Sequence, residues 1–263
     1  MKTGTTALLL ALLTAALPFA TGSARAADRP TIAAASDLQF ALTEAAAAFA
    51  QKTGRDVNLS FGSSGNFFRQ IRQRAPFEMF LSADEDFVQR LAAAGLTEDA
   101  GALYAVGRIV LIAPVGSPLA GDGSLRDLAV ALEDGRLKKF AIANPEHAPY
   151  GRAAEEALRY AGLWETIADK LVYGENVSQA AQFALSGNTE GGIVAWSLAL
   201  APEVAARSTY ALIPEMAHAP LRQRMVLLNG AGETARGFYA FMQEEEARAI
   251  MRRYGFVLPG ETM

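Results

Sequence analysis

Residues 61–72, FGSSGNFFRQIR, decide the fold of this 263-residue chain. An alternating apolar run ends at Phe61, a Gly-Ser-Ser-Gly-Asn turn follows, and a helical pattern begins after the turn. The first N–H groups of a helix have no intrahelical partner and lie at the positive end of the helix dipole. The hydroxyls of Ser63 and Ser64 beside such a turn favour anion binding, although a single serine there is more often only a helix cap.

The same order of strand, turn and helix recurs on both sides of this stretch. Short apolar runs that precede helical stretches lie at 31–35, 57–61, 79–82, 139–143, 170–173 and 191–194. Regular alternation of strands and helices predicts an α/β fold, in which mostly parallel sheets are flanked by helices. Residues 97–107 look poor in helix.

Two further strands suggest that the chain crosses between two lobes. The apolar run at 108–113 would carry it into a second lobe, and residues 210–213 would bring it back. A strand at 223–228 and two helices at 233–241 and 244–254 would then complete the first lobe. We therefore expect lobe 1 to comprise residues 27–108 and 213–263, and lobe 2 to comprise residues 109–212.

Residues 1–26 have the pattern of a secretory signal peptide. Lys2 is followed by an apolar run at 7–20 and by Ala24-Arg25-Ala26 as a cleavage site, and the run is too short to span a bilayer. The chain contains no cysteine, which excludes disulfides, thiolate metal sites and a lipid-anchored cysteine. We expect an exported protein of the bacterial periplasm that does not insert into the membrane.

The charge balance argues against polyanionic partners. The formal net charge is -4, and removal of Lys2 and Arg25 with the signal peptide makes it -6. Nucleic acids and anionic membrane surfaces are bound through clusters of lysine and arginine. We therefore expect neither of them as a partner.

Four turns at the expected helix starts share a polar character. Ser36 precedes a helix with Gln39 three residues later, which is the spacing of a capping box. The other three turns are Ser63-Ser64-Gly65, the stretch 144–151 with Pro149 at a first helical position, and the stretch 174–178. Ligands of open α/β sheets bind beyond the carboxyl ends of the strands, where all four turns would lie, two from each lobe.

With these turns the sequence resembles the periplasmic molybdate-binding proteins of ABC importers, along nearly the whole mature chain. The matching stretches are AAASDLQFAL (33–42), FGSSGNFFRQI (61–71), FLSADEDFV (80–88), NPEHAPYGRAA (144–154), YGENVSQAAQFALSGN (173–188), GIVAWSLAL (192–200) and RYGF (253–256). The resemblance implies a two-lobed periplasmic binding protein fold of type II-like architecture, with the ligand in the cleft between the lobes. It also implies capture of molybdate, and of tungstate, for delivery to a membrane permease by a monomer without a cofactor.

The resemblance also implies which residues bind the oxyanion. The expected ligand groups are the hydroxyls and amides of Ser36 and Ser64 and the backbone at Tyr150 and Val177, with Asp37 and Ser63 beside them. The only metal expected near Ser36, Ser64, Tyr150 and Val177 is the molybdenum atom of a bound molybdate ion. Because these groups are neutral, the affinity is expected to be nearly independent of salt, and of pH between about 6 and 8.

Two positions differ from what relatives show. Ala195 and Trp196 stand where some relatives bring in a tyrosine hydroxyl, and the hydroxyl of Tyr150 is a candidate replacement. Asp37 would repel a dianion at close range, so we expect its side chain to turn to the helix's own amides and only its N–H to face the ligand. A carboxylate directed into the cleft would argue against the anion.

Other functions have weaker support. A secreted α/β hydrolase would need His147 or His218 near a serine nucleophile, and no G-x-S-x-G elbow is present. A different tetrahedral oxyanion, such as sulfate or phosphate, is the main alternative, because a protonated phosphate would suit the acceptor carboxylate of Asp37. A secreted interaction protein would need an exposed apolar patch. The acidic run at 84–86 is better explained by its place in a first helical turn than as a metal site.

Overall fold

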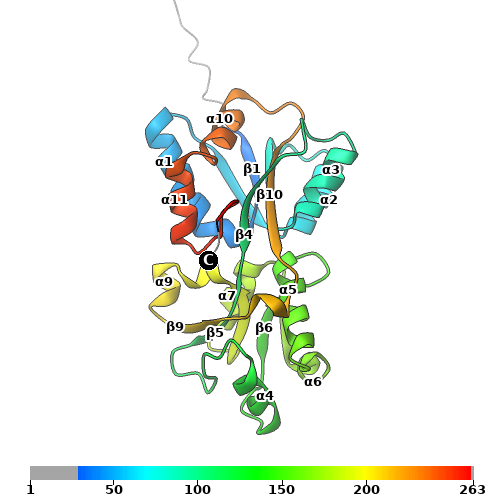
Figure 1. The fold of residues 1–263 in the computed structure, drawn as a ribbon, viewed down its shortest axis with the longest axis vertical. Helices are drawn as coiled ribbons and strands as arrows, with labels where there is room; N and C mark the ends of the chain where they lie inside the picture. Colours follow the sequence, from blue (N-terminus) through cyan, green and yellow to red (C-terminus); the bar gives the residue numbers. More distant parts are fainter. Residues whose placement is uncertain (1–28, 262–263) are drawn as a thin grey trace, which may run out of the picture.

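The structure is a computed structural model that describes residues 29–261, so the expected signal peptide at 1–26 lies outside the described residues (Figure 1). Within this range, no helix has the length and apolar character needed to cross a membrane. The chain forms two sheets of five strands, with orders β2-β1-β3-β10-β4 and β7-β6-β8-β5-β9. Each sheet is flanked by helices, which is the two-lobed α/β binding-protein fold expected from the sequence.

The first sheet combines both ends of the described chain. Its strands are β1 (Thr31–Ala35), β2 (Asn58–Gly62), β3 (Met79–Ser82), β4 (Ala102–Gly107) and β10 (Leu221–Leu227). Strand β1 pairs in parallel with β2 and β3, whereas β10 runs antiparallel between β3 and β4. The helical segments are η1 (Ser36–Leu38), α1 (Gln39–Thr53), α2 (Ser64–Arg72), α3 (Glu85–Ala93), α10 (Glu233–Phe241) and α11 (Glu245–Arg253).

Apolar side chains cover both faces of this sheet. On one face Phe49 of α1 packs against Phe238 and Phe241 of α10, with ring centroids 5.3 and 5.7 Å away. On the other face Phe67 of α2 packs near Phe80 of β3. Helices α1, α10 and α11 accordingly lie on the opposite side of the sheet from α2 and α3 (Figure 1).

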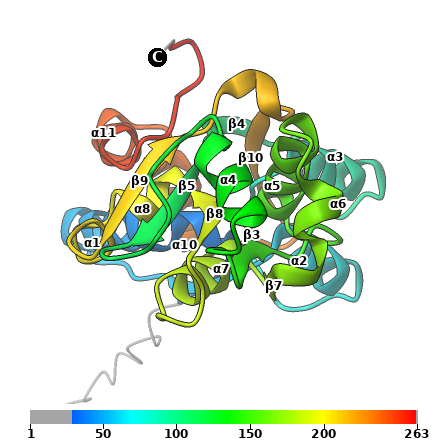
Figure 2. The ribbon, with the colours of Figure 1, turned by 90° about the horizontal axis from the view of Figure 1, so that it is seen from below.

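The second sheet comes from one continuous stretch of chain. Its strands are β5 (Ile109–Pro114), β6 (Phe140–Ala143), β7 (Leu171–Gly174), β8 (Gly191–Ala195) and β9 (Ser208–Leu212). Its helical segments are α4 (Arg126–Glu133), α5 (Pro149–Tyr160), α6 (Trp164–Ile167), η2 (Ala168–Lys170), α7 (Val177–Ala184), α8 (Trp196–Ala199), α9 (Pro202–Ala205) and η3 (Glu215–Ala217). Helices α5 and α6 lie together at one side, whereas α8 lies next to α1 of the first sheet (Figure 2).

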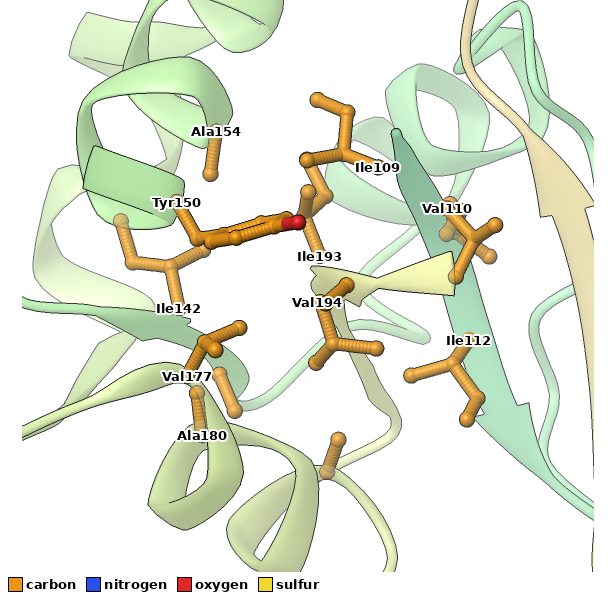
Figure 3. Close-up of a cluster of buried hydrophobic side chains, with 14 of the residues drawn as sticks. Ile109, Val110, Ile112, Ile142, Tyr150, Ala154, Val177, Ala180, Ile193 and Val194 are labelled. Atoms are coloured by element: carbon orange, nitrogen blue, oxygen red, sulfur yellow. The ribbon is translucent and has the colours of Figure 1, made fainter. Parts of the chain in front are cut away.

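The core of this second half is aliphatic. Ile109, Val110 and Ile112 of β5 and Ile193 and Val194 of β8 are fully or almost fully buried. The ring of Tyr150 extends from the start of α5 into the same cluster (Figure 3). The first turn of α5 is therefore anchored in the core.

Two short connections join the sheets. Strand β4 passes through Arg108 directly into β5, and residues 213–220 lead from β9 back to β10. Arg108 is buried, and its guanidinium group donates to Glu215 Oε1 at 2.8 Å and to the Ile213 carbonyl at 3.2 Å, so it ties the two connections together. We propose residues 109–212 as one lobe and the flanking described segments as the other, because all five strands of the second sheet lie within 109–212.

Two elements were not predicted, and one local expectation was wrong. Residues 102–107, expected only to be poor in helix, form β4, which pairs with β10. Helix α4 was not expected at all. The capping box at Ser36 does not form: Ser36 begins the 3-10 turn η1, and α1 starts at Gln39 without a side-chain cap.

Candidate functional site

The carboxyl ends of β1, β2, β6 and β7 bring the four polar turns together between the lobes. A cavity there is lined by Ala35, Ser36, Asp37, Gly62, Ser63, Ser64, Ala83, Ala148, Pro149, Tyr150 and Val177. All six site residues predicted from the sequence are among them, and all six are buried. The cavity is small, and its volume of about 10 Å³ suits one water molecule.

Backbone N–H groups from both lobes line this cavity without partners. Ser64 is the first residue of α2, Val177 is the first residue of α7, and Tyr150 follows Pro149 in the first turn of α5. Within residues 29–261, the N–H groups of these three residues and of Ser36 make no hydrogen bond. The N–H of Gly151, in the same first turn as Tyr150, instead donates to the Ala148 carbonyl at 2.9 Å.

Two serine hydroxyls are set to donate into the same space. Ser64 Oγ accepts the Ala83 N–H at 2.9 Å, and Ser36 Oγ accepts the Ser178 N–H at 3.3 Å. Within the described chain, neither hydroxyl proton has an acceptor. Each hydroxyl oxygen already accepts a hydrogen bond, and its proton remains available to donate to a ligand.

Ser63 has a different role from its neighbour. It is the N-cap of α2, where its Oγ accepts the Asn66 N–H at 3.4 Å, and it lies 3.0 Å from Nδ1 of His147. The cap explanation therefore holds for Ser63. His147 itself does not line the cavity.

The expectation for the Asp37 side chain was wrong. Its carboxylate does not cap the helix; Oδ2 accepts hydrogen bonds from Tyr150 Oη at 3.0 Å and from Gln223 Nε2 at 2.7 Å, whereas the buried Oδ1 has no partner. Burial raises the pKa of this carboxyl group from 3.8 to about 6, although bonds from Gln223, Tyr150 and its own N–H act in the opposite direction. A carboxyl group that readily holds a proton therefore lies at the cavity wall.

The Tyr150 hydroxyl is also committed elsewhere. It donates to Asp37 and accepts from Gln223 Nε2 at 2.9 Å, so its single proton is already used. Burial, then the nearby Asp37 charge, raises the pKa of Tyr150 well above its ordinary value, which keeps the phenol neutral. Ala195 and Trp196 do not line the cavity, and the indole packs against Gly255.

Direct hydrogen bonds hold the two lobes together around the cavity. The Gly65 N–H donates to the His147 carbonyl at 3.0 Å, and Ser197 Oγ donates to the Asp37 carbonyl at 2.7 Å. Ser178 Oγ lies 2.9 Å from the Ser36 carbonyl and 2.6 Å from Gln39 Oε1. The sequence did not predict these contacts, because each pair joins segments that are far apart in the chain. For the hydrogen bonds of the Asp37 side chain, the one available signal was a polar residue, Gln223, inside an apolar strand.

Cationic side chains lie outside the lining of the cavity. None of the described residues that line it is lysine, arginine or histidine. Arg152 of the second lobe pairs with Asp84 of the first, which also caps α3, and Asn66 donates to Glu175 across the cleft. Within the described chain, no group of acidic or histidine side chains is placed to hold a metal ion. The arrangement is suited to bind a small anion through neutral donors.

Known proteins resemble this chain over most of its length. The family model for bacterial extracellular solute-binding proteins matches residues 30–257. The chain is 36% identical to the molybdate-binding protein ModA of Rhodobacter capsulatus, over 98% of this chain and 96% of the relative. It is 29% identical to a Bacillus subtilis protein named as a putative ABC transporter substrate-binding lipoprotein, over 86% of this chain and 85% of that protein. The solved periplasmic molybdate-binding protein of Azotobacter vinelandii superposes with a TM-score of 0.78 at 29% identity, covering 88% of this chain and all of that chain.

Gly65 provides a test of lobe closure. A Cβ atom at this position would lie 2.6 Å from the His147 carbonyl oxygen, so Gly65→Ala should hold the lobes apart. We expect its affinity for the oxyanion to fall at least about tenfold, which corresponds to about 1.4 kcal/mol. The unfolding free energy of the ligand-free variant should change little, because the higher helix propensity of alanine, by up to about 1 kcal/mol over glycine, offsets the loss of the Gly65 N–H to His147 contact.

Calorimetry would measure the affinities, and small-angle scattering would measure the radius of gyration. On ligand binding, the radius of gyration of the wild type should fall more than that of the variant. Gly237→Ala in α10 is the matched control, because its Cβ would make only ordinary contact with Phe49 at 3.6 Å. Equal affinities of Gly65→Ala and Gly237→Ala would show that this approach does not limit closure.

Asp37 predicts a pH dependence of the ligand-free stability. Because its pKa is higher in the folded than in the unfolded chain, its contribution is fully present below about pH 3.8 and is lost as the pH rises through about 6. Between pH 5 and pH 8 the wild type should lose about 1.4 kcal/mol of unfolding free energy relative to Asp37→Asn. Urea unfolding at both pH values measures this difference. Asp86→Asn, which removes an exposed carboxylate, should keep the pH dependence of the wild type. Parallel pH profiles for the wild type and Asp37→Asn would contradict the assignment.

Proposed function

This chain belongs to the bacterial extracellular solute-binding proteins, and on that premise we propose that it captures molybdate, and also tungstate, and delivers it to the permease of an ABC importer. It is a binding protein and not an enzyme. The observation that carries the proposal is the convergence of unpartnered N–H groups and two serine hydroxyls from both lobes on one cavity. The molybdate-binding relatives, which match nearly the whole chain, support the choice of anion.

Neutral donors are sufficient for a dianion in such a cavity. The starts of α2 and α7 direct the positive ends of their helix dipoles at the space, and hydrogen bonds to a charged acceptor are stronger than neutral ones. Within residues 29–261, no cationic side chain lines the cavity, so no ion pair has to break when the ligand leaves. The cleft can therefore release its ligand by opening alone.

Location and partners follow from the same proposal. The expected signal peptide and the extracellular family favour the periplasm, where a captured anion would be handed to a permease. A relative named as an ABC transporter substrate-binding protein supports that partner. We propose that the protein acts as a monomer, because each donor that lines the cavity comes from the same chain.

Selectivity among anions is the direct test. Calorimetric titration of residues 27–263 should give tight binding of molybdate and tungstate and at least tenfold weaker binding of sulfate and phosphate. A smaller oxygen shell leaves some donors unpaired, and each unpaired buried donor is unfavourable by about 1 to 3 kcal/mol. Sulfate or phosphate binding as tight as molybdate would overturn the choice of anion; phosphate is the stronger competitor, because Asp37 could accept its proton.

The two donor serines should be distinguishable from the capping serine. Ser36→Ala and Ser64→Ala should each weaken molybdate binding by about 1.5 to 3 kcal/mol, the usual contribution of a hydrogen bond to a charged group. Ser63→Ala is the control, since it removes the α2 cap and should lower stability by about 1 kcal/mol with little effect on affinity. Titration calorimetry and thermal unfolding of all three variants would separate the effects, and a Ser64→Ala variant with wild-type affinity would remove Ser64 from the site.

A further inference from the structure

We propose that the oxyanion binds together with one proton, which is held between the anion and Oδ1 of Asp37. Asp37 is then a specificity-determining residue, because its carboxyl group meets the ligand as a neutral hydrogen-bond donor. This inference rests on the proposed function of the cavity as an oxyanion site. It replaces the expectation that the affinity is independent of pH between about 6 and 8.

The geometry of Asp37 leaves one position for the proton. The residue is 1% exposed, and its Oδ2 already accepts two hydrogen bonds, from Tyr150 and from Gln223. Oδ1 is buried without a partner at a residue that lines the cavity. An ionised oxygen in this position is poorly stabilised, whereas a protonated Oδ1 is a donor that needs an acceptor. An oxygen atom of the anion would supply that acceptor.

A chain of buried hydrogen bonds fixes this orientation. Tyr104 Oη donates to Gln223 Oε1 at 2.7 Å, so the amide group of Gln223 turns its Nε2 towards Asp37 Oδ2 and Tyr150. Ser197 Oγ holds the backbone carbonyl of Asp37 from the second lobe. Within residues 29–261, none of these neighbours is placed to form a hydrogen bond with Oδ1.

The charges that face Asp37 do not favour its ionised form. Asp37 faces the phenols of Tyr104 on β4 and Tyr150 on α5. Burial, and then the charge of Asp37, raises the pKa of both phenols well above the ordinary value, so both remain neutral. From β10 and α8 it faces the uncharged Gln223 and Ser197. Within residues 29–261, no cationic side chain hydrogen bonds to it, and a dianion in the cavity would raise its pKa further above about 6.

The bound state holds one proton between Asp37 and the anion for different oxyanions, but the source of that proton differs. With a weakly basic dianion such as molybdate, the proton comes from solvent and stays on Asp37. With hydrogen phosphate, the ligand brings the proton and ionised Asp37 accepts it. The proposed ligand residues contact oxygen atoms only, so no metal coordination enters this balance.

Proton uptake can be measured by titrating the mature protein with molybdate at pH 7.5 in buffers of different ionisation enthalpy. The wild type should take up close to one proton per anion, and Asp37→Asn close to none. The wild-type dissociation constant should rise about tenfold from pH 7 to pH 8. In the ligand-free protein the Asp37 carboxyl group has a pKa of about 6 and is ionised in this range, so it must take up a proton when the anion binds. Asp37→Asn, which keeps a donor at this position, should show a flat profile and bind more tightly than the wild type at pH 8.

Asp86→Asn is the matched control, since it removes an exposed carboxylate outside the cavity and should retain the wild-type uptake. Tight molybdate binding by the wild type without proton uptake at pH 7.5 would overturn the proton proposal and leave the proposed function intact. Failure of the wild type to bind any oxyanion between pH 5.5 and 8 would instead overturn the proposed function. The wild-type measurement decides the question even if Asp37→Asn does not fold.

Discussion

Unpartnered N–H groups at the starts of helices are the constraint on which the arrangement of the two lobes depends. Buried N–H groups are almost always hydrogen-bonded in folded proteins, so several of them around one cavity require an acceptor from outside the chain. Here they come from helices of both lobes, and the turns that carry them meet through bonds such as Gly65 N–H to the His147 carbonyl. Under the proposed function, an anion bound between these turns would stabilise the contacts between the two lobes.

Asp37 introduces a second requirement in the same place. Its carbonyl is held by Ser197, and its carboxyl group by Tyr150 of one lobe and Gln223 of the other. A carboxyl group in this environment serves an anion site only in its neutral form. The cavity therefore combines neutral backbone donors with a side chain whose charge depends on what it binds.

Much of the fold could be predicted from local patterns. Strands β1 and β3 match the apolar runs at 31–35 and 79–82 residue for residue, and α10 matches the helix expected at 233–241. Strand β4 was missed because its strand character depends on pairing with β10, far along the chain. Residues that follow strand ends could be placed at the cavity from the sequence, since the carboxyl ends of parallel strands meet at one edge.

Side-chain directions at the site could not be predicted in the same way. The capping-box spacing of Ser36 and Gln39 is a local signal, but Ser178 of the other lobe engages both residues. Asp37 likewise turns towards Tyr150 and Gln223, which no local pattern connects to it. Tertiary contacts between distant segments thus decide the polar details.

The position of β10 between β3 and β4 has a consequence for how the molecule is made. The second sheet draws all its strands from 109–212, so it can form as soon as that stretch is available, whereas the first sheet lacks an inner strand until residues 221–227 have been synthesised. Pairing across such a long sequence separation is slow, because the loop between the partners must close first. Gln223 arrives on that same strand, so the hydrogen bonds around Asp37 are completed among the last steps of folding. A nascent chain stopped before β10 would lack both an inner strand of the first sheet and the Gln223 partner of Asp37.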